Sequence, residues 1–139
     1  MKEYRIIIAG SRDFNNQTTL NNIVTDYILK KYLDDDMSIE NSLIKFEIIS
    51  GHANGADTLG EKFAIEMGYK LTLFPANWNK YGKSAGPIRN RQMAEYANEN
   101  ENGVLFAFWD GHSRGTKNMI DMAKRYGLEI YVHRYSYLD

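Results

Sequence analysis

The sequence has 139 residues, 43% of them hydrophobic and 25% charged, which is the composition of one globular domain spanning residues 1–139. A net charge of −1 excludes a protein that is held on nucleic acid or anionic membranes by its overall charge. Cysteine is absent, which excludes disulfides and thiolate chemistry. No apolar run reaches the ~18 residues that a membrane span needs, and we expect a cytoplasmic protein.

Short β-rich runs alternate with helical patterns along the chain. We expect strands at Tyr4–Ala9, Lys45–Ser50, Lys70–Phe74, Gly103–Trp109 and Leu128–His133. Apolar residues at helical spacing predict four helices, at Leu20–Ile28, Ala56–Met67, Pro87–Ala97 and Met119–Tyr126, with Gly68 and Gly127 ending the second and the fourth. This alternation predicts an α/β fold: a single Rossmann-like three-layer domain with a mainly parallel five-stranded sheet of order 3-2-1-4-5 and helices on both faces.

One polar stretch, Asp34–Ser42, breaks this pattern and is predicted to be a surface connection. Its consecutive aspartates do not suggest a metal site, because a metal needs ligands spread around it in space. We expect neither a metal ion nor a cofactor in this protein.

Glycine and basic residues gather in the four segments that leave the ends of strands one to four. These segments are Gly10–Phe14, Ser50–Thr58, Pro75–Arg91 and Trp109–Lys117. Ligands of open α/β sheets bind outside the carboxyl ends of the strands, at the switch in strand order, so we expect all four segments on one rim.

Charge is divided unevenly between these segments and the rest of the chain. The segments hold seven basic and three acidic residues, a net charge of +4, whereas the remainder holds ten basic and fifteen acidic residues, a net charge of −5. Basic side chains beside glycine-rich turns that open helices are suited to phosphate, because glycine lets backbone N–H groups approach its oxygens.

Each element of this site has an alternative interpretation. Gly10-Ser11 could form only a tight turn, and Asp57 could cap its helix rather than accept hydrogen bonds from a ribose. The helix N-terminus would lower the pKa of Asp57, which makes this aspartate a poor proton donor. Ser113 is a candidate N-cap as well as a phosphate contact. The aromatic residues of the loops could stack on a base or cover the sheet edge: Trp78, Tyr81 and Trp109.

Taken together, the four segments resemble the SLOG superfamily. The residues that carry this resemblance are GSRDF at 10–14, SGHANGAD at 50–57, PANWNKYGKSAGPIRNRQM at 75–93 and WDGHSRGT at 109–116. This Rossmann-like group contains the DNA-processing protein DprA and the LOG cytokinin-activating phosphoribohydrolases. Within the group, the chain is most similar to the small stand-alone YspA/YpsA-like branch.

The resemblance implies a nucleotide or a nucleotide-derived ligand such as an ADP-ribose derivative. The glycine loops would hold phosphate and ribose, three arginines would neutralise charge, and Asp57 would accept hydrogen bonds from ribose hydroxyls. The predicted ligand-binding residues are Gly10, Ser11, Arg12, Gly51, His52, Asn54, Gly55, Asp57, Arg89, Arg91, Ser113, Gly115 and Thr116.

Two departures from the family pattern bear on catalysis. LOG-type hydrolases carry a glutamate at the position that Met119 occupies here, and a methionine cannot stabilise an oxocarbenium-like state. The branch usually has a small residue where His52 stands. An arginine that matches the LOG catalytic arginine survives as Arg89 or Arg91.

We therefore expect a sensor or sequestering protein for a nucleotide-like ligand, such as an ADP-ribose-like molecule. One alternative is an N-glycosidase or phosphoribohydrolase that acts on a nucleotide, with Asp57, Asp110 and Arg89 as candidate catalytic residues and Asp13 as a further replacement for the absent glutamate. Another is single-stranded nucleic-acid binding as in DprA, which the confined basic patch disfavours. The predicted partner is the small molecule and not a membrane, and a homodimer or a higher homo-oligomer is compatible with so compact a domain.

Overall fold

A computed structural model of the chain describes residues 2–34 and 44–136. The strands are β1 (Lys2–Gly10), β2 (Ile44–Ser50), β3 (Lys70–Leu73), β4 (Gly103–Trp109) and β5 (Glu129–Arg134). The helices are α1 (Gln17–Asp34), α2 (Ala56–Met67), α3 (Trp78–Tyr81), α4 (Ala85–Asn98) and α5 (Arg114–Arg125), with a 3-10 turn at Gly82–Ser84. Among the described residues, no helix has both the length and the apolar character that a bilayer span requires.

The strands form one sheet in the order β3-β2-β1-β4-β5, and each neighbouring pair is parallel. Ile6 of β1 pairs with Ile48 of β2 on one side and with Val104 of β4 on the other. The predicted α/β fold and its strand order are therefore confirmed. Because the chain runs from β1 toward β3 and then crosses back to β4, the order switches between β1 and β4.

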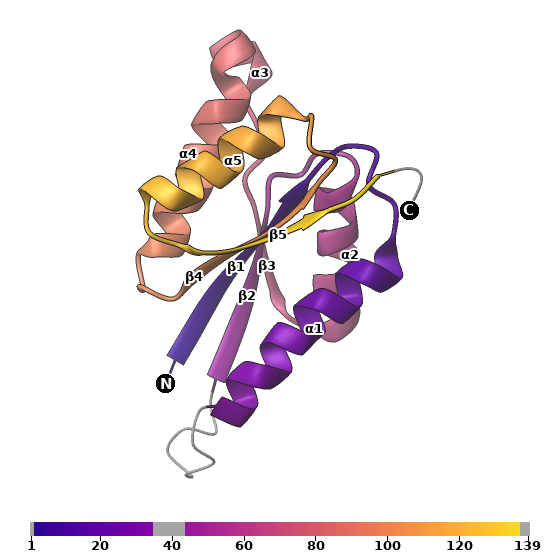
Figure 1. Cartoon of the computed structure of the whole chain (residues 1–139). Coiled ribbons are helices and arrows are strands. Elements are labelled where there is room, and N and C mark those ends of the chain that lie inside the picture. The colour runs from indigo at the N-terminus through magenta and orange to yellow at the C-terminus, as the bar shows by residue number, and fades with distance from the viewer. Residues whose placement is uncertain (1, 35–43, 137–139) are drawn as a thin grey trace.

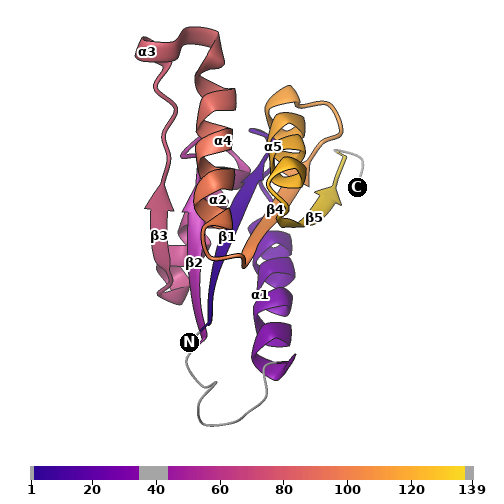
Figure 2. The ribbon, with the colours of Figure 1, turned by 90° about the vertical axis from the view of Figure 1, so that its left-hand side faces the viewer.

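Helices cover both faces of this sheet, as Figures 1 and 2 show. Successive side chains of a strand point to opposite faces, and β1 is apolar on both. Ile6 and Ile8 pack in a core with α1 and α2, while Ile7 and Ala9 pack in a second core with α4 and α5. This double burial explains why β1 has a continuous isoleucine run instead of an alternating pattern.

The connection from β3 to α4 holds an element that the sequence did not predict. The predicted loop Pro75–Arg91 contains the short helix α3, where the side chain of Asn77 accepts a hydrogen bond from the N–H of Lys80 at 3.0 Å. Four residues are too few to show helical periodicity. Figure 2 shows α3 projecting beyond the sheet above β3 and α4, so this connection stands over one side of the strand ends.

The second helix ends as the sequence predicted, at Gly68. This residue has φ of 75° and its N–H donates to carbonyl groups in the last turn of α2, a conformation that favours glycine. For the predicted connection Asp34–Ser42, Asp34 is the last residue of α1, and the remainder lies outside the described residues.

Candidate functional site

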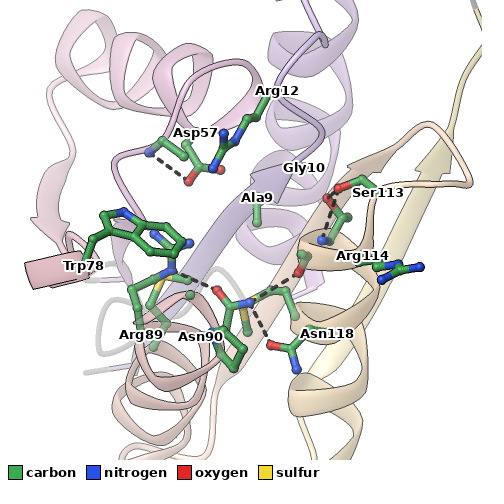
Figure 3. A pocket seen from close by; sticks show the side chains of 17 residues that line it. Ala9, Gly10, Arg12, Asp57, Trp78, Arg89, Asn90, Ser113, Arg114 and Asn118 are labelled. Atoms are coloured by element: carbon green, nitrogen blue, oxygen red, sulfur yellow. Dashed lines mark hydrogen bonds between the residues drawn. The ribbon is translucent and has the colours of Figure 1, made fainter. Parts of the chain in front are cut away.

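A cavity of about 280 Å³ opens at the carboxyl end of β1, where the strand order switches. All four predicted segments contribute to it: the first through Gly10 and Arg12, the second through Asp57, the third through Arg89 and the fourth through Gly115. We call this space the inner cavity. The expectation that the segments share one rim is confirmed, and Figure 3 shows their side chains around the end of β1.

A second cavity, of about 260 Å³, adjoins the first, and we call it the outer cavity. The two share the residues Arg12, Ala53, Trp78 and Arg89. Gly51, His52 and Asn54 line only the outer one. Each cavity alone lies just below the ~300 Å³ at which small-molecule sites begin, whereas a ligand extended across both would have the space of an ordinary site.

Three helices begin at the inner cavity. Its lining includes the first turns of α2 at Asp57, of α4 at Gly86 and of α5 at Gly115 and Thr116. The first-turn N–H groups of a helix lack partners within that helix, and the helix dipole places partial positive charge there. Helix N-termini and arginine side chains at one cavity are features that favour an anion.

Two glycines and a serine hold the glycine-rich loops together beneath this site. A Cβ atom at Gly10 would lie 2.2 Å from the carbonyl oxygen of Phe108, and one at Gly55 would lie 2.3 Å from that of Ser11. Gly55 also has φ of 79°. The buried Ser11 accepts a hydrogen bond from the N–H of Asp110 at 3.1 Å and so joins the first loop to the fourth. Ser11 and Gly55 were predicted to contact ligand, but they line neither cavity and instead set the distance between loops.

Arg89 is the most firmly positioned cation of the site. Its Nε donates to Asn90 Oδ1 at 2.9 Å, and its Nη1 donates to the carbonyl oxygen of Gly51 at 2.5 Å. A Cβ atom at Gly51 would lie 2.6 Å from Nη1, so a larger residue there would displace the guanidinium from this position. Burial lowers the pKa of Arg89, Asp57 opposes that change, and Arg12 adds to it. An arginine at this position nevertheless keeps its charge at neutral pH.

Asn90 links this arginine to the fourth loop. Its Nδ2 donates to the carbonyl oxygen of Gly115 at 3.2 Å and to Asn118 Oδ1 at 2.9 Å, as the dashed lines in Figure 3 show. Both asparagines line the inner cavity, and Asn90 is buried. Sequence reasoning missed these two residues, because asparagine carries no signal of its own outside a motif. In the RNR run at 89–91, only the two arginines were predicted to bind ligand.

Asp57 behaves differently from the sequence-based expectation. It does not cap α2, because the flanking residue of that helix is Gly55, and its Oδ2 instead accepts a hydrogen bond from the N–H of Ala53 at 3.2 Å. Burial raises the pKa of Asp57 to about 6, although the hydrogen bond from Ala53 and the charge of Arg89 oppose this effect. The predicted lowering of its pKa is therefore wrong, since desolvation outweighs the helix terminus.

The fourth loop is built around Asp110 and Ser113. Asp110 Oδ1 accepts hydrogen bonds from the N–H groups of His112 at 2.8 Å and Ser113 at 2.7 Å. Burial raises the pKa of Asp110, but these hydrogen bonds together outweigh burial, so its pKa lies below the ordinary value. The predicted N-cap role of Ser113 is confirmed, because its side chain accepts from the N–H of Thr116. Asp110 lines neither cavity, so its contacts are those of a loop-forming residue.

Arg91 is not brought to the site. Two residues beyond Arg89 on α4, it is exposed, forms an ion pair with Glu95 at 3.7 Å, and lines neither cavity. Arg114, which sequence reasoning counted only as a loop charge, lines the inner cavity, although Figure 3 shows its guanidinium extending away from the other side chains. Of the two candidates for the arginine of LOG-type enzymes, only Arg89 lies at the cavity.

One carboxylate candidate, Asp13, and the position of the LOG glutamate, Met119, remain to be placed relative to the cavities. Met119 is buried and lines the inner cavity, where it contributes apolar surface. Asp13 is hydrogen-bonded to the hydroxyl of Tyr135 and lies outside both cavities. Asp57 is thus the only carboxylate among the described residues that line either cavity.

Comparison with known proteins identifies the family of the chain. The YAcAr family, described as the YspA, cpYpsA-related SLOG family, matches residues 4–81, which include the first two glycine loops. The chain belongs to this SLOG family. A similar protein is the Gene 61 protein of Mycobacterium phage D29, which is 28% identical over 131 residues that cover 91% of this chain and 93% of the phage protein. No solved structure matches the chain.

Proposed function

We propose that this SLOG-family protein binds a nucleotide or a nucleotide-derived phosphorylated ligand, such as an ADP-ribose-like molecule, as a sensor or sequestering protein. The observation that carries this proposal is the convergence of three helix N-termini and the fixed guanidinium of Arg89 on one cavity at the strand switch. Such a cavity offers both backbone donors and positive charge to a phosphate. Membership of the SLOG family is consistent with the same class of ligand.

Each wall of the two cavities has a role in this proposal. A phosphate lies at the start of α5, near Gly115 and Thr116, and is neutralised by Arg89 and Arg12. Asp57 accepts a hydrogen bond from a ribose hydroxyl. Trp78, which is 52% exposed and lines both cavities, offers an indole face on which a base stacks.

Thermal unfolding in the presence of AMP, ADP-ribose and NAD tests the proposal. A ligand at 100 times its Kd adds about 2.7 kcal/mol to the free energy of unfolding, which raises Tm by roughly 10 °C in a domain of this size. We expect Arg89→Ala to remove most of this rise relative to its own ligand-free Tm. Arg91→Ala is the matched control, because this arginine lies on the same helix but outside both cavities.

The proposal fails if none of these nucleotides raises Tm at millimolar concentration. It also fails if Arg89→Ala and Arg91→Ala reduce the rise equally, since general surface charge would then explain the effect. Added salt weakens the Arg89-dependent rise, because ions screen the attraction between the guanidinium and the phosphate.

Asp57 favours a second candidate function, hydrolysis of the N-glycosidic bond of a nucleotide. A buried carboxyl group whose pKa is raised to about 6 holds a proton more readily than an ordinary aspartate, as a general acid does. In such a reaction the bond between the anomeric carbon and the base breaks, a water oxygen joins that carbon, and the departing base takes up a proton. Single-turnover product analysis tests it: free base and ribose phosphate form within minutes with the wild type and not with Asp57→Asn.

A further inference from the structure

Outside the groups used above, three polar side chains form a chain of hydrogen bonds beside the outer cavity. The hydroxyl of Ser50, which is fully buried, donates to Glu61 Oε2 at 2.7 Å. The same carboxylate is hydrogen-bonded to His52 Nδ1, which lies 3.1 Å from Oε1 and 3.0 Å from Oε2. The backbone N–H of His52 in turn donates to the Ser50 hydroxyl oxygen at 3.0 Å. Both the ring and the backbone of His52 are thereby fixed.

The backbone of His52 is held in an unfavourable conformation. Its φ is 60°, in the left-handed region that a residue with a Cβ atom rarely adopts, and glycine would be the ordinary choice there. Residues kept in such conformations cluster at binding and active sites. This strained position therefore carries a large polar side chain, although its backbone conformation favours glycine.

The hydrogen bond to Glu61 decides which ring nitrogen faces the ligand space. With Nδ1 donating to Glu61, Nε2 is left to accept or, in the imidazolium form, to donate. Among the described residues, no hydrogen bond engages Nε2, and the side chain is 55% exposed and lines the outer cavity. Nε2 of His52 is thus available for a hydrogen bond to an anionic oxygen in the outer cavity.

The charges around the outer cavity have one sign. Arg12, Arg89 and His52 line it, and no carboxylate does among the described residues. Two carboxylates of α2 belong to this part of the site: Glu61 is hydrogen-bonded to Nδ1 of the ring, and Asp57 lines the inner cavity and not the outer one. A phosphoryl group in the outer cavity would meet three basic side chains and the amide of Asn54.

From this arrangement we propose that the outer cavity is a second phosphoryl subsite and that His52, oriented by Glu61, makes it selective. The ligand class is then a nucleotide with two phosphoryl groups, one at the start of α5 and one between His52 and the two arginines. This inference rests on the proposed function, because it assigns the second group of the same ligand. It differs from a simple anion site in that an imidazole held in place by Glu61 contributes to affinity.

Calorimetric titration with AMP, ADP and adenosine 3′,5′-bisphosphate measures the contribution of the second phosphoryl group and its position. We expect one of the two doubly phosphorylated nucleotides to bind wild type at least tenfold more tightly than AMP, as one charge-assisted hydrogen bond would give. His52→Gln keeps a polar side chain of similar reach but has no titratable charge. We expect the ratio of its own affinities for the doubly phosphorylated nucleotide and for AMP to fall from at least ten to near one.

Glu61→Gln separates the orienting role of Glu61 from its charge. The variant keeps an oxygen that can accept a hydrogen bond from His52 Nδ1. We expect it to retain more of the gain from the second phosphoryl group than His52→Gln does. A gain no larger than that of His52→Gln would contradict the orienting role.

Where AMP binds, equal gains in the wild type and His52→Gln, or the absence of any gain over AMP, would overturn the inference while leaving the proposed function intact. Inorganic pyrophosphate, compared with phosphate, probes the subsites without base or ribose. If pyrophosphate binds in a His52-dependent manner and no nucleotide binds, the second phosphoryl subsite holds, but the nucleotide class assigned to it and the proposed function are wrong. If neither nucleotides nor pyrophosphate bind, both are wrong.

Discussion

Replacing Asp57 by asparagine removes the only carboxylate that lines the cavities in the described part of the chain. The side chain keeps its shape, and its oxygen can still accept the hydrogen bond from the N–H of Ala53. The substitution removes the negative charge of a side chain that is 5% exposed, and it leaves one acceptor oxygen for the N–H groups of Ala53 and Gly10. We therefore expect Asp57→Asn to stabilise the ligand-free protein at neutral pH, even though it lies in the candidate site.

The pKa of Asp57 gives the size and the sign of this effect. Burial raises it from the ordinary 3.8 to about 6, so the folded state holds this proton more tightly than the unfolded state does. A pKa difference of about two, at 1.36 kcal/mol per unit, costs about 3 kcal/mol of stability once the carboxyl is ionised in both states. This cost develops as pH rises from about 4 to 6 and stays constant above that range.

Urea unfolding of the wild type and Asp57→Asn at several pH values measures the difference. We expect the variant to be more stable by about 3 kcal/mol at pH 8 and by less than about 1 kcal/mol at pH 4. Asp110→Asn is the matched control with the opposite sign, because hydrogen bonds hold the pKa of Asp110 below its ordinary value. Asp110 contributes stability above the unfolded pKa, and that contribution is lost as pH falls through the folded one.

The reasoning is refuted if the difference between the wild type and Asp57→Asn does not change between pH 4 and 8. A change of the opposite direction would show that hydrogen bonds and Arg89 dominate over burial at this carboxylate. If the two aspartate variants respond to pH with the same sign, the contrast between a desolvated and a hydrogen-bonded carboxylate is wrong.

Three glycine-related substitutions separate packing from ligand contact. In Gly115→Ala the added methyl group meets no atom within 4 Å, so we expect urea unfolding to show unchanged stability or a gain of up to about 1 kcal/mol from helix propensity. The methyl group enters the inner cavity, so we expect calorimetry to show weaker nucleotide binding. Gly10→Ala places its methyl group 2.2 Å from the carbonyl oxygen of Phe108, and we expect a loss of about 1–3 kcal/mol in chemical unfolding, with unchanged stability as the contradicting result. His52→Gly relieves a φ of 60°, and we expect a gain of about 1 kcal/mol in the same assay, reduced by the lost contact with Glu61; a clear destabilisation would show that this contact outweighs the backbone strain.

The fold was predictable because its main signals are local in sequence. A continuous apolar run marks β1 as buried on both faces, and alternating strands and helices leave few ways to cover a parallel sheet. The order of the strands and the gathering of the glycine loops on one rim follow from that topology. The sequence could not predict α3, because four residues held by the side chain of Asn77 carry no periodicity.

The position at which α4 begins determines which of Arg89 and Arg91 faces the cavity. Arg89 and Arg91 are equivalent as members of one basic segment, but α4 begins at Ala85 and includes both. At 3.6 residues per turn, two residues apart on a helix point in directions about 200° apart, so one arginine faces the cavity and the other faces solvent. The sequence determined that a cation would be available here, and the helix determined which one.

The direction of the pKa shift of Asp57 and the partner of His52 depend on tertiary structure. From the sequence, Asp57 is an acid near a helix N-terminus, where a lowered pKa is the local expectation. Packing of α2 against the loops at Gly10 and Gly51 removes this carboxyl from water, and desolvation reverses the direction. His52 meets Glu61 nine residues away only because the loop turns back over α2. Composition and spacing determine which charges the loops contain, but the solvent and partners that each charge meets exist only after the chain has folded.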